Sequence, residues 1–480
     1  MIATQQLKHN SNGMANNMCN KREYDNFVAM KSQLRSNSGF KPLFIPDKAF
    51  DFQKYLIEWN MLNARVANFA DCGLGKSLLE LTFAENVVRK ENKPVLIICP
   101  IAVAEQMKRE GEKFGIEAKV SRDGNRNGAK IVITNYERLH YFNPKDYIGS
   151  IPDESSAIKA FDGKRRKLVT RFMSKHKYRL MGTATASPND FIELGTHSEA
   201  LGELTQSEMI DQYFRSSDKK RHDLFKDGDF WNRAKYFFRP HAEIPFWRFV
   251  CSWARALRKP SDLGYDDNGF ILPKLIEEQI MIDHEFIPPG ELFPRVARTL
   301  REQREERSRT LMQRCEKVAE IVLSHKDENV VIWCDYNPEG ELLAKLIPDC
   351  VEVAGRHSDE EKEEKLEAFS TGKIKRLVTK MKIAGFGLNW QHVGLQTMFP
   401  SHSFEKRYQS IRRSWRFGRK GDVKIFTVTT PGEAGITENL KKKQEKTDRM
   451  FSSLVREMNN SSKFTASNNH LAEMEHPSWL

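Results

Sequence analysis

The chain of 480 residues carries 77 lysines and arginines against 65 aspartates and glutamates, which gives a net charge of +12. This length leaves room for about three domains of ~150 residues, and a hydrophobic fraction of 39% excludes wholesale disorder. The longest apolar run, residues 95–104, is too short to cross a bilayer, and the seven cysteines contain no Cys-x-x-Cys pair that would indicate a zinc site or a disulfide framework.

The elements predicted along the chain fall into five segments. Residues 1–40 are rich in Asn, Ser, Gln and Lys, which predicts a flexible N-terminal arm. In residues 41–200, short apolar runs alternate with helical patterns, as in a parallel sheet covered by helices. The alternation stops in residues 201–290, an aromatic and basic stretch that we expect to be a helical insertion. It returns in residues 291–430, and residues 431–480 predict a C-terminal helix and tail.

A glycine-rich loop joins a predicted strand to a predicted helix in the first of these α/β segments. Gly73 and Gly75 allow backbone N–H groups to curve around phosphate oxygens, and the helix N-terminus adds its positive end. In such a loop, Lys76 reaches the β- and γ-phosphates and Ser77 binds Mg²⁺. Ala70 stands where the full pattern has glycine, but Gly-Lys-Ser in this position predicts a phosphate-binding loop.

An acidic pair, Asp153 and Glu154, follows further along the same segment. Such a pair at the end of a strand can hold Mg²⁺ and polarise an attacking water. Acidic pairs are also common on surfaces, and the strand before this one is short and contains Pro152. The order of the motifs favours the catalytic interpretation, because the pair follows the phosphate loop and precedes the Gly-Thr-Ala of residues 182–184.

A third signal lies in the second half of the chain. Gln409, Arg413 and Arg416 fall on one face of a predicted helix. The planar guanidinium group suits the spread charge of a phosphoryl group in transfer. Taken alone, the pattern is more typical of a solvated basic helix.

The insertion carries a possible basic stripe. If a helix runs from residue 244 through residue 259, its apolar residues fall on one face, and the opposite face presents Arg248, Arg255 and Lys259. Such a stripe could face nucleic-acid phosphates, and the net charge of +12 agrees with a polyanionic partner. A packed helix with an ordinary solvated face is the simpler interpretation.

In this order, the motifs resemble those of superfamily 2 helicases and translocases over about residues 40–430. The likeness is nearest to the Swi/Snf-like branch, in the compact DEAD/DEAH-box-like form found in bacteriophages. The resemblance implies an α/β fold of two RecA-like parallel-sheet lobes with an inserted helical segment and a C-terminal helix. It also implies that ATP and Mg²⁺ bind between lobes that close during hydrolysis.

The resemblance also assigns the individual site residues. Gln53 resembles the glutamine that contacts adenine, and Gly385 and Gly387 lie in a segment that resembles motif V. Gln409 belongs to a segment that matches motif VI, and Gly73, Gly75, Lys76 and Ser77 match motif I. The metal ligands implied are Ser77 and Asp153, and the catalytic residues implied are Lys76, Glu154, Arg413 and Arg416.

The activity implied by the resemblance is ATP hydrolysis coupled to movement along nucleic acid, with duplex DNA as the expected partner. We expect the chain to be a monomer. We also expect it in the cytoplasm, of a bacterial host if the gene is carried by a phage, because the first residues show no signal-peptide pattern. Two alternatives remain open. One is a strand-separating helicase, although the sequence shows no obvious wedge hairpin. The other is a DNA-binding scaffold with weak ATPase activity, against which the intact Lys76, Glu154 and Arg413 argue.

Overall fold

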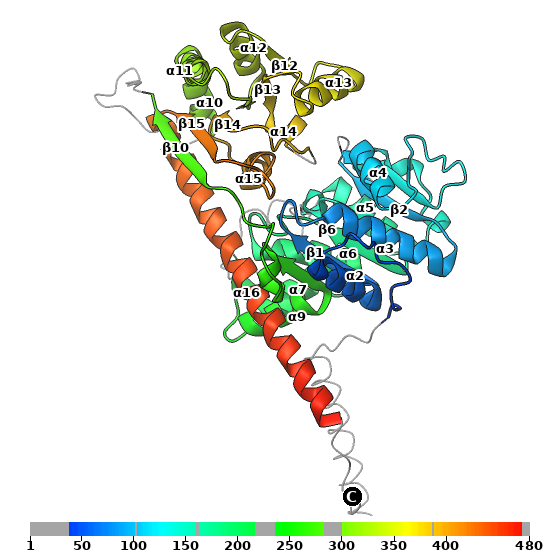
Figure 1. Cartoon of the computed structure of the whole chain (residues 1–480). Coiled ribbons are helices and arrows are strands. Elements are labelled where there is room, and N and C mark those ends of the chain that lie inside the picture. Colours follow the sequence, from blue (N-terminus) through cyan, green and yellow to red (C-terminus); the bar gives the residue numbers. More distant parts are fainter. Residues whose placement is uncertain are drawn as a thin grey trace, which may run out of the picture.

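The structure is a computed structural model that describes residues 38–100, 103–159, 163–216, 236–282, 300–385 and 388–472. The predicted N-terminal arm, 1–40, lies almost entirely outside these residues, as does Gly387. Two parallel sheets form two lobes, and one long helix runs along both (Figure 1). Within the described ranges, no helix is both long and apolar enough to span a bilayer.

The first lobe is built on a seven-stranded sheet in which neighbouring strands are parallel. The strands in spatial order are β3 (Lys119–Val120), β4 (Ile131–Asn135), β2 (Val95–Cys99), β5 (Gly149–Pro152), β6 (Tyr178–Gly182), β1 (Arg65–Ala70) and β9 (Ala254–Leu257). Strands β2, β5 and β6 are buried along their whole lengths. Parallel strands that are covered on both faces are continuous apolar runs in the sequence, which is why the sequence predicts them.

Helices cover both faces of this sheet and enclose two apolar clusters. One cluster lies under α2 (Asp51–Asn63), α3 (Lys76–Glu91) and α4 (Ala104–Lys113). The other lies under α5 (Lys164–Met173), α6 (Leu194–Leu201), α7 (Gln206–Tyr213) and α9 (Glu243–Trp253). Alternate residues of β1 point into the two clusters, so this strand contributes to the core on both faces of the sheet.

The second lobe contains a six-stranded parallel sheet. Its strands in spatial order are β10 (Leu275–Met281), β15 (Val423–Thr429), β14 (Leu395–Met398), β11 (Val330–Cys334), β13 (Arg376–Lys380) and β12 (Cys350–Val353). The helices of this lobe are α10 (Leu300–Arg309), α11 (Leu311–Ser324), α12 (Asn337–Leu346), α13 (Asp359–Ser370), α14 (Met381–Ala384) and α15 (Phe404–Ile411).

The stretch predicted as an insertion, 201–290, is shared between the lobes where the structure describes it. It supplies β9 at one edge of the first sheet and β10 at one edge of the second. A short antiparallel pair, β7 (Phe214–Ser216) and β8 (Tyr236–Phe238), also comes from this stretch. Its helices α7 and α9 pack into the core of the first lobe.

The basic stripe predicted on a helix from residue 244 to residue 259 is wrong. Helix α9 ends at Trp253, and residues 254–257 extend as β9, whose backbone pairs with β1. This pairing satisfies the backbone groups of β1, which outweighs the helical spacing of the side chains. The three basic residues have separate partners: Arg248 pairs with Glu457 (3.2 Å), Arg255 lies over the Trp59 ring (4.0 Å), and Lys259 pairs with Asp267 (3.2 Å).

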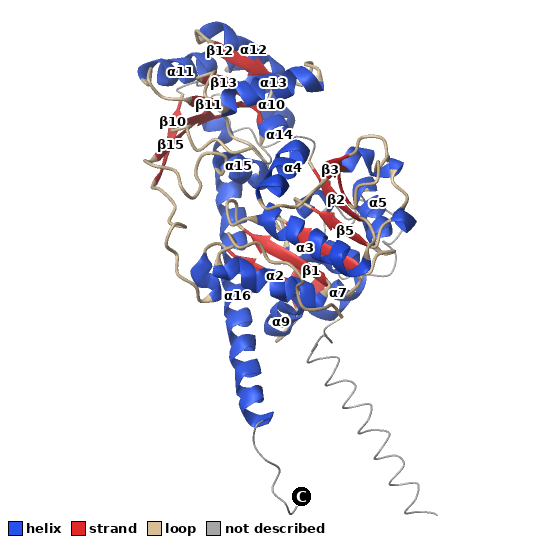
Figure 2. Cartoon of the chain, turned by 45° about the vertical axis from the view of Figure 1, so that its right-hand side comes forward, coloured by secondary structure: helices blue, strands red, loops and turns tan. Residues whose placement is uncertain are grey.

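The predicted C-terminal helix is confirmed as α16 (Ala434–Ala472), a single helix of 39 residues. It begins beside the second lobe and continues along the first (Figures 1 and 2). Its residues Met450, Phe451, Leu454 and Met458 are buried in the apolar cluster under α9. Two all-parallel α/β lobes and a C-terminal helix make up the fold class that the sequence predicts.

Candidate functional site

The predicted phosphate loop connects β1 to α3 at the C-terminal edge of the first sheet. Gly73 and Gly75 have φ angles of +91° and +85°, in the left-handed region that favours glycine. Gly75 is also the N-cap of α3 and supplies no side-chain cap, so the N–H groups of the first helical turn are open to an anion. Ser77 lies on that turn and is half-buried. This geometry fits a phosphate group.

Gln53 connects helix α2 to this loop. Its Nε2 donates a hydrogen bond to the carbonyl oxygen of Leu74 (3.1 Å), and its Oε1 accepts one from the Phe50 N–H (3.0 Å). The side chain lies so close to Gly75 that a Cβ at this glycine would overlap its Nε2. Gln53 therefore holds the loop through the Leu74 backbone, and its close approach requires glycine at position 75.

Lys76 lies across the same loop. Its Nζ donates to the carbonyl oxygens of Ala70 (3.0 Å) and Asp71 (3.3 Å). Burial alone would lower the pKa of Lys76, but the neighbouring Cys72 and Glu154 outweigh it and raise the pKa. The ammonium group is therefore charged at neutral pH, and its present partners are carbonyl groups that a phosphate could replace.

The acidic pair follows β5 directly. The N–H of Asp153 donates to Ile98 O (2.8 Å), which continues the ladder between β5 and β2 beyond Pro152. Pro152 is the last residue of β5. Glu154 has a φ of +48°, a left-handed conformation that costs a non-glycine residue on the order of 1 kcal/mol. Its Oε2 accepts a hydrogen bond from Thr183 Oγ1 (3.3 Å).

A residue that the sequence analysis missed, Glu80, completes the acidic cluster. It lies one helical turn after Lys76 on α3, is buried, and has its carboxyl group beside that of Asp153. Burial raises the pKa of Glu80 well above its usual range, and burial together with the charge of Glu154 raises the pKa of Asp153 to about 7. The spacing of four residues from Lys76 was the available signal, because it puts both side chains on one helix face.

The residues of the candidate site suit a Mg²⁺ ion that is shared with a phosphate, rather than one held by the protein alone. The described residues include no cluster of three or more side chains arranged to hold a metal ion by themselves. A Mg²⁺ ion commonly takes one or two protein ligands and completes its shell with phosphate oxygens and water. Ser77, in the first turn of α3, and Asp153, directly after β5, are residue types that suit such an ion.

The arginine motif adopts a different local structure from the predicted one. Helix α15 ends at Ile411, so the single helical face predicted for Gln409, Arg413 and Arg416 is wrong. The two arginines are nevertheless together: Arg413 Nη1 and Arg416 Nη1 both donate to the carbonyl oxygen of Leu388, at 3.0 and 3.3 Å. Leu388 belongs to the segment 384–389 that resembles motif V, so its backbone contacts the segment that resembles motif VI.

The two arginines make an electrostatic environment suited to an anion. Arg413 is 3% exposed, and within the described residues neither it nor Arg416 forms an ion pair with a carboxylate. Burial and the adjacent charge of Arg413 lower the pKa of Arg416 to about 10, at which it is still a cation at neutral pH. A buried and a half-buried cation, whose side chains donate to carbonyl groups, favour a negatively charged ligand.

The two halves of the site meet across the lobe junction. Gln409 Nε2 on α15 donates to Glu154 Oε2 (3.3 Å) and to Thr185 Oγ1 (3.4 Å) in the first lobe. The sequence analysis missed three further residues of this junction, which are Asp71, Tyr408 and Arg412. Their types are ordinary, and only the fold brings them together.

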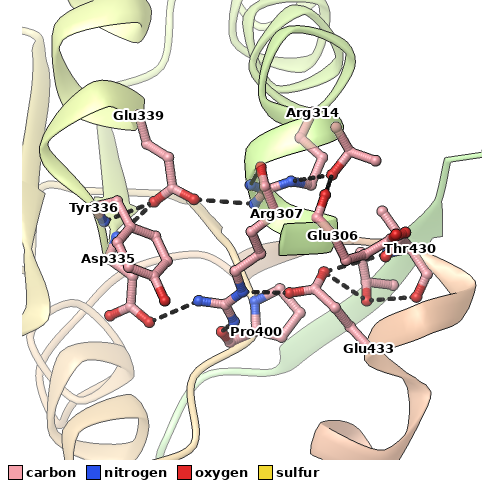
Figure 3. A network of polar contacts seen from close by, with 11 residues as sticks. Glu306, Arg307, Arg314, Asp335, Tyr336, Glu339, Pro400, Thr430 and Glu433 are labelled. Carbon is pink, nitrogen blue, oxygen red and sulfur yellow. Dashed lines mark hydrogen bonds and ion pairs between the residues drawn. The ribbon is translucent and has the colours of Figure 1, made fainter. Parts of the chain in front are cut away.

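A second polar network lies at the C-terminal edge of the second sheet (Figure 3). Arg307 of α10 is 3% exposed and bonds Glu433 (2.6 Å), Asp335 (3.1 Å) and the carbonyl oxygen of Pro400. Arg314 pairs with Glu339 (3.1 Å) beside it. Every charge in this network has a partner, so we assign it a structural role that holds the start of α16 against the second lobe.

Comparisons with known proteins bear on the fold of the chain. Residues 313–418 match the family model of the helicase conserved C-terminal domain. No curated protein matches the sequence. A variant of S. cerevisiae Dbp5 bound to RNA and ADP-BeF3 shares 13% identity over 84% of this chain and 93% of its own, with a TM-score of 0.53. The DUF1998 helicase MrfA bound to DNA and AMPPNP shares 14% identity over 84% of this chain and 54% of its own, with a TM-score of 0.52.

A third solved structure, the Sulfolobus solfataricus SWI2/SNF2 ATPase core in complex with dsDNA, is 18% identical over 87% of this chain and 96% of its own, with a TM-score of 0.39. The similarity to Dbp5 and MrfA confirms the fold of two RecA-like lobes that the sequence motifs predict. At 13% and 14% identity, the likeness to Dbp5 and MrfA shows the fold alone.

Proposed function

We propose that the chain is an ATP-dependent nucleic-acid translocase that hydrolyses ATP between its two lobes and moves along duplex DNA. The observation that carries this proposal is the contact between Gln409 of the second lobe and Glu154 of the first. It brings the segment with Arg413 and Arg416 against the lobe with the predicted phosphate loop, so the groups proposed for hydrolysis are divided between the two lobes.

In the proposed reaction, water attacks the γ-phosphorus, and the bond to the β–γ bridging oxygen breaks to give ADP and phosphate. Lys76 exchanges its carbonyl partners for the β- and γ-phosphate oxygens. Glu154 accepts the proton of the attacking water, and Gln409 orients that carboxylate. Mg²⁺, held by Ser77 and Asp153, neutralises charge on the phosphates when bound.

The arginines act on the same phosphate from the other lobe. Arg413 and Arg416 stabilise the charge that spreads over the γ-phosphoryl oxygens as it is transferred. Because they belong to the second lobe, their engagement depends on how the lobes close, and each cycle of binding and hydrolysis therefore changes the position of one lobe relative to the other. Nucleic acid bound across both lobes would be moved by this change.

The choice of duplex DNA rests on the sequence motifs, which favour the compact, phage-type members of the Swi/Snf-like branch. A net charge of +12 suits a polyanion. Among the similar folds, Dbp5 is bound to RNA and MrfA to DNA, so other nucleic acids belong in the test. We further propose that the chain acts as a monomer in the cytoplasm.

The test is ATP turnover with duplex DNA, single-stranded DNA and RNA, accompanied by triplex-displacement and strand-separation assays. We expect stimulation by duplex DNA and displacement of a triplex strand without unwinding. Lys76→Ala is the matched control, and it should abolish turnover while the protein stays folded. Unwinding would favour a strand-separating helicase, and DNA binding without turnover would favour a scaffold. Turnover by Lys76→Ala at the wild-type rate would refute the assignment of the site.

A further inference from the structure

The junction between the lobes contains a buried ion pair for which the proposed hydrolysis gives no role. Arg412, the residue after α15, is fully buried and donates through Nη2 to Asp71 Oδ2 (2.8 Å) and to the carbonyl oxygen of Cys72 (2.8 Å). Asp71 and Cys72 are the first residues of the phosphate loop. A side chain of the second lobe therefore holds both a carboxylate and the backbone of the loop.

A residue of α15 itself reaches the same carboxylate. Tyr408, one helical turn before Arg412, donates from its hydroxyl to Asp71 Oδ1 (2.7 Å). Both carboxylate oxygens of Asp71 are thus bonded to the second lobe. One bond from α15 and one from the residue that follows it fix the orientation of the helix relative to the loop, which a single ion pair would not do.

Aromatic rings enclose this contact. The guanidinium of Arg412 lies 5.0 Å from the ring of Trp415 and 5.4 Å from that of Phe417. Phe417 is itself buried in the apolar cluster of the first lobe, where it packs against Phe270 (5.5 Å) and lies over Gly73. Exclusion of water strengthens the attraction between the charges and makes the loss of one partner costly.

The contact is also incomplete in a specific way. Nε and Nη1 of Arg412 are buried and have no hydrogen-bond partner among the residues that the structure describes. Buried donors without acceptors are unfavourable, so this arrangement is poorly explained as a device for stability alone. A phosphate oxygen that enters the loop is an acceptor of the kind these donors lack.

We infer that Asp71 and Arg412 are positioning residues, whose ion pair docks the second lobe on the phosphate loop and thereby presents Arg413, the next residue in the chain, to the nucleotide. The presentation of Arg413 rests on the proposed function, whereas the docking does not. A matched contact is available for comparison. Arg109 and Glu367 also join the lobes, but they are 3.8 Å apart and 59% and 58% exposed, and such pairs contribute little.

The docking can be tested without nucleotide or nucleic acid, by measuring the separation of the lobes with small-angle X-ray scattering. We expect Asp71→Asn and Arg412→Gln to open the lobes, with a fall in the closed-to-open ratio on the order of 100-fold. The double variant should open them no further than either single variant, because the two residues form one contact. Glu367→Gln should leave the lobes as in the wild type.

Turnover supplies the second readout. With saturating ATP and DNA, Asp71→Asn should lower kcat at least about tenfold and leave the affinity for a fluorescent ATP analogue within about threefold, because the effect is on closure. Arg412→Lys should recover part of the closure, and Tyr408→Phe, which removes only a hydroxyl and should not disturb folding, should open the lobes partially.

Lobes that stay closed in Asp71→Asn or in Tyr408→Phe would overturn the inference, and so would single-variant effects that simply add in the double variant. If the wild-type chain hydrolyses no ATP, the proposed function fails, and the scattering result still decides whether the ion pair docks the lobes.

Discussion

The carboxyl groups of Glu80 and Asp153 lie side by side in the interior of the first lobe, one on α3 and one at the end of β5. No amide, hydroxyl or cationic donor within the described residues reaches either oxygen of Glu80. Burial raises the pKa of Glu80 well above its usual range, which favours the protonated carboxyl group that can donate to Asp153. Gly182 leaves the space that Glu80 needs, since a Cβ there would overlap its carboxyl group.

This relationship predicts different outcomes for two substitutions of Glu80. Glu80→Gln keeps a donor at the same place and should retain both stability and ATP turnover. Glu80→Ala removes a hydrogen bond to a charged group and should lower the free energy of unfolding by about 2–3 kcal/mol, with a loss of turnover. Urea unfolding and steady-state ATPase measure both. Glu85→Ala on the same helix is the control, because its pair with Arg89 lies at the surface. Equal effects of Gln and Ala would show that no donor is needed.

The burial of His197 predicts that the stability of the fold depends on pH. His197 is fully buried on α6, its Nε2 lies 3.0 Å from Ser155 Oγ, and burial lowers its pKa to about 4 from the ordinary 6.5. Between pH 4 and pH 6.5 the unfolded chain binds more protons than the folded one. The stabilising contribution of the neutral His197 is therefore full above about pH 6.5 and is lost as the pH falls. At pH 5 the loss from this residue is about 2 kcal/mol.

The raised pKa of Asp153 acts in the opposite direction over part of this range, so the measurement has to be a difference between two proteins. Unfolding free energies of the wild type and of His197→Gln are compared at pH 7.5 and pH 5. The variant should lose less stability than the wild type on acidification, by about 2 kcal/mol. A difference between the two proteins that does not change with pH would contradict the buried neutral state of His197.

We expect substitution of Arg307 to destabilise the second lobe strongly. Its removal in Arg307→Ala leaves Glu433, which is fully buried, without its charge partner (Figure 3). Breaking a buried pair in this way costs about 3–5 kcal/mol. The control on the same helix is Arg301→Ala, whose pair with Glu305 is exposed and worth at most about 0.5 kcal/mol. Thermal unfolding distinguishes them, and melting temperatures that fall equally would show that the network is not important for stability.

The sequence predicts the two lobes well because its strongest patterns are local. Buried parallel strands give continuous apolar runs, as in β2, and the phosphate loop is recognised from a few adjacent residues. The ends of α9 and α15 are predicted poorly, because the pairing of β9 with β1 and the turn after Ile411 depend on partners far along the chain.

The residues that the sequence analysis missed share the same cause. Arg412 contacts Asp71 across 341 positions of sequence, and Tyr408 contacts it across 337. By residue type, Arg412 is indistinguishable from its neighbour Arg413, yet one bonds a carboxylate of the other lobe and the other bonds carbonyl groups of its own. Periodicity and motif spacing give no information about such a difference.

Arg416 gives the most direct test of the division of the site between the lobes. Arg416 bonds the Leu388 carbonyl oxygen and has Cys72 of the predicted phosphate loop as a neighbour, so it lies near the loop while belonging to the second lobe. A pKa of about 10 keeps it cationic at neutral pH. In the proposed mechanism it acts on the charge of the transition state, so Arg416→Ala should reduce turnover by about 10³- to 10⁵-fold and barely weaken ATP binding.

The loss should not be additive with that of Arg413→Ala, because both guanidinium groups serve one developing charge and share the Leu388 carbonyl as a partner. Lys420→Ala, an exposed position in the same segment, should turn over ATP like the wild type. The measurements are steady-state ATPase with saturating DNA and equilibrium binding of a fluorescent ATP analogue. Turnover within a few-fold of the wild type in Arg416→Ala, or a loss confined to binding, would mean that hydrolysis does not depend on an arginine supplied by the second lobe.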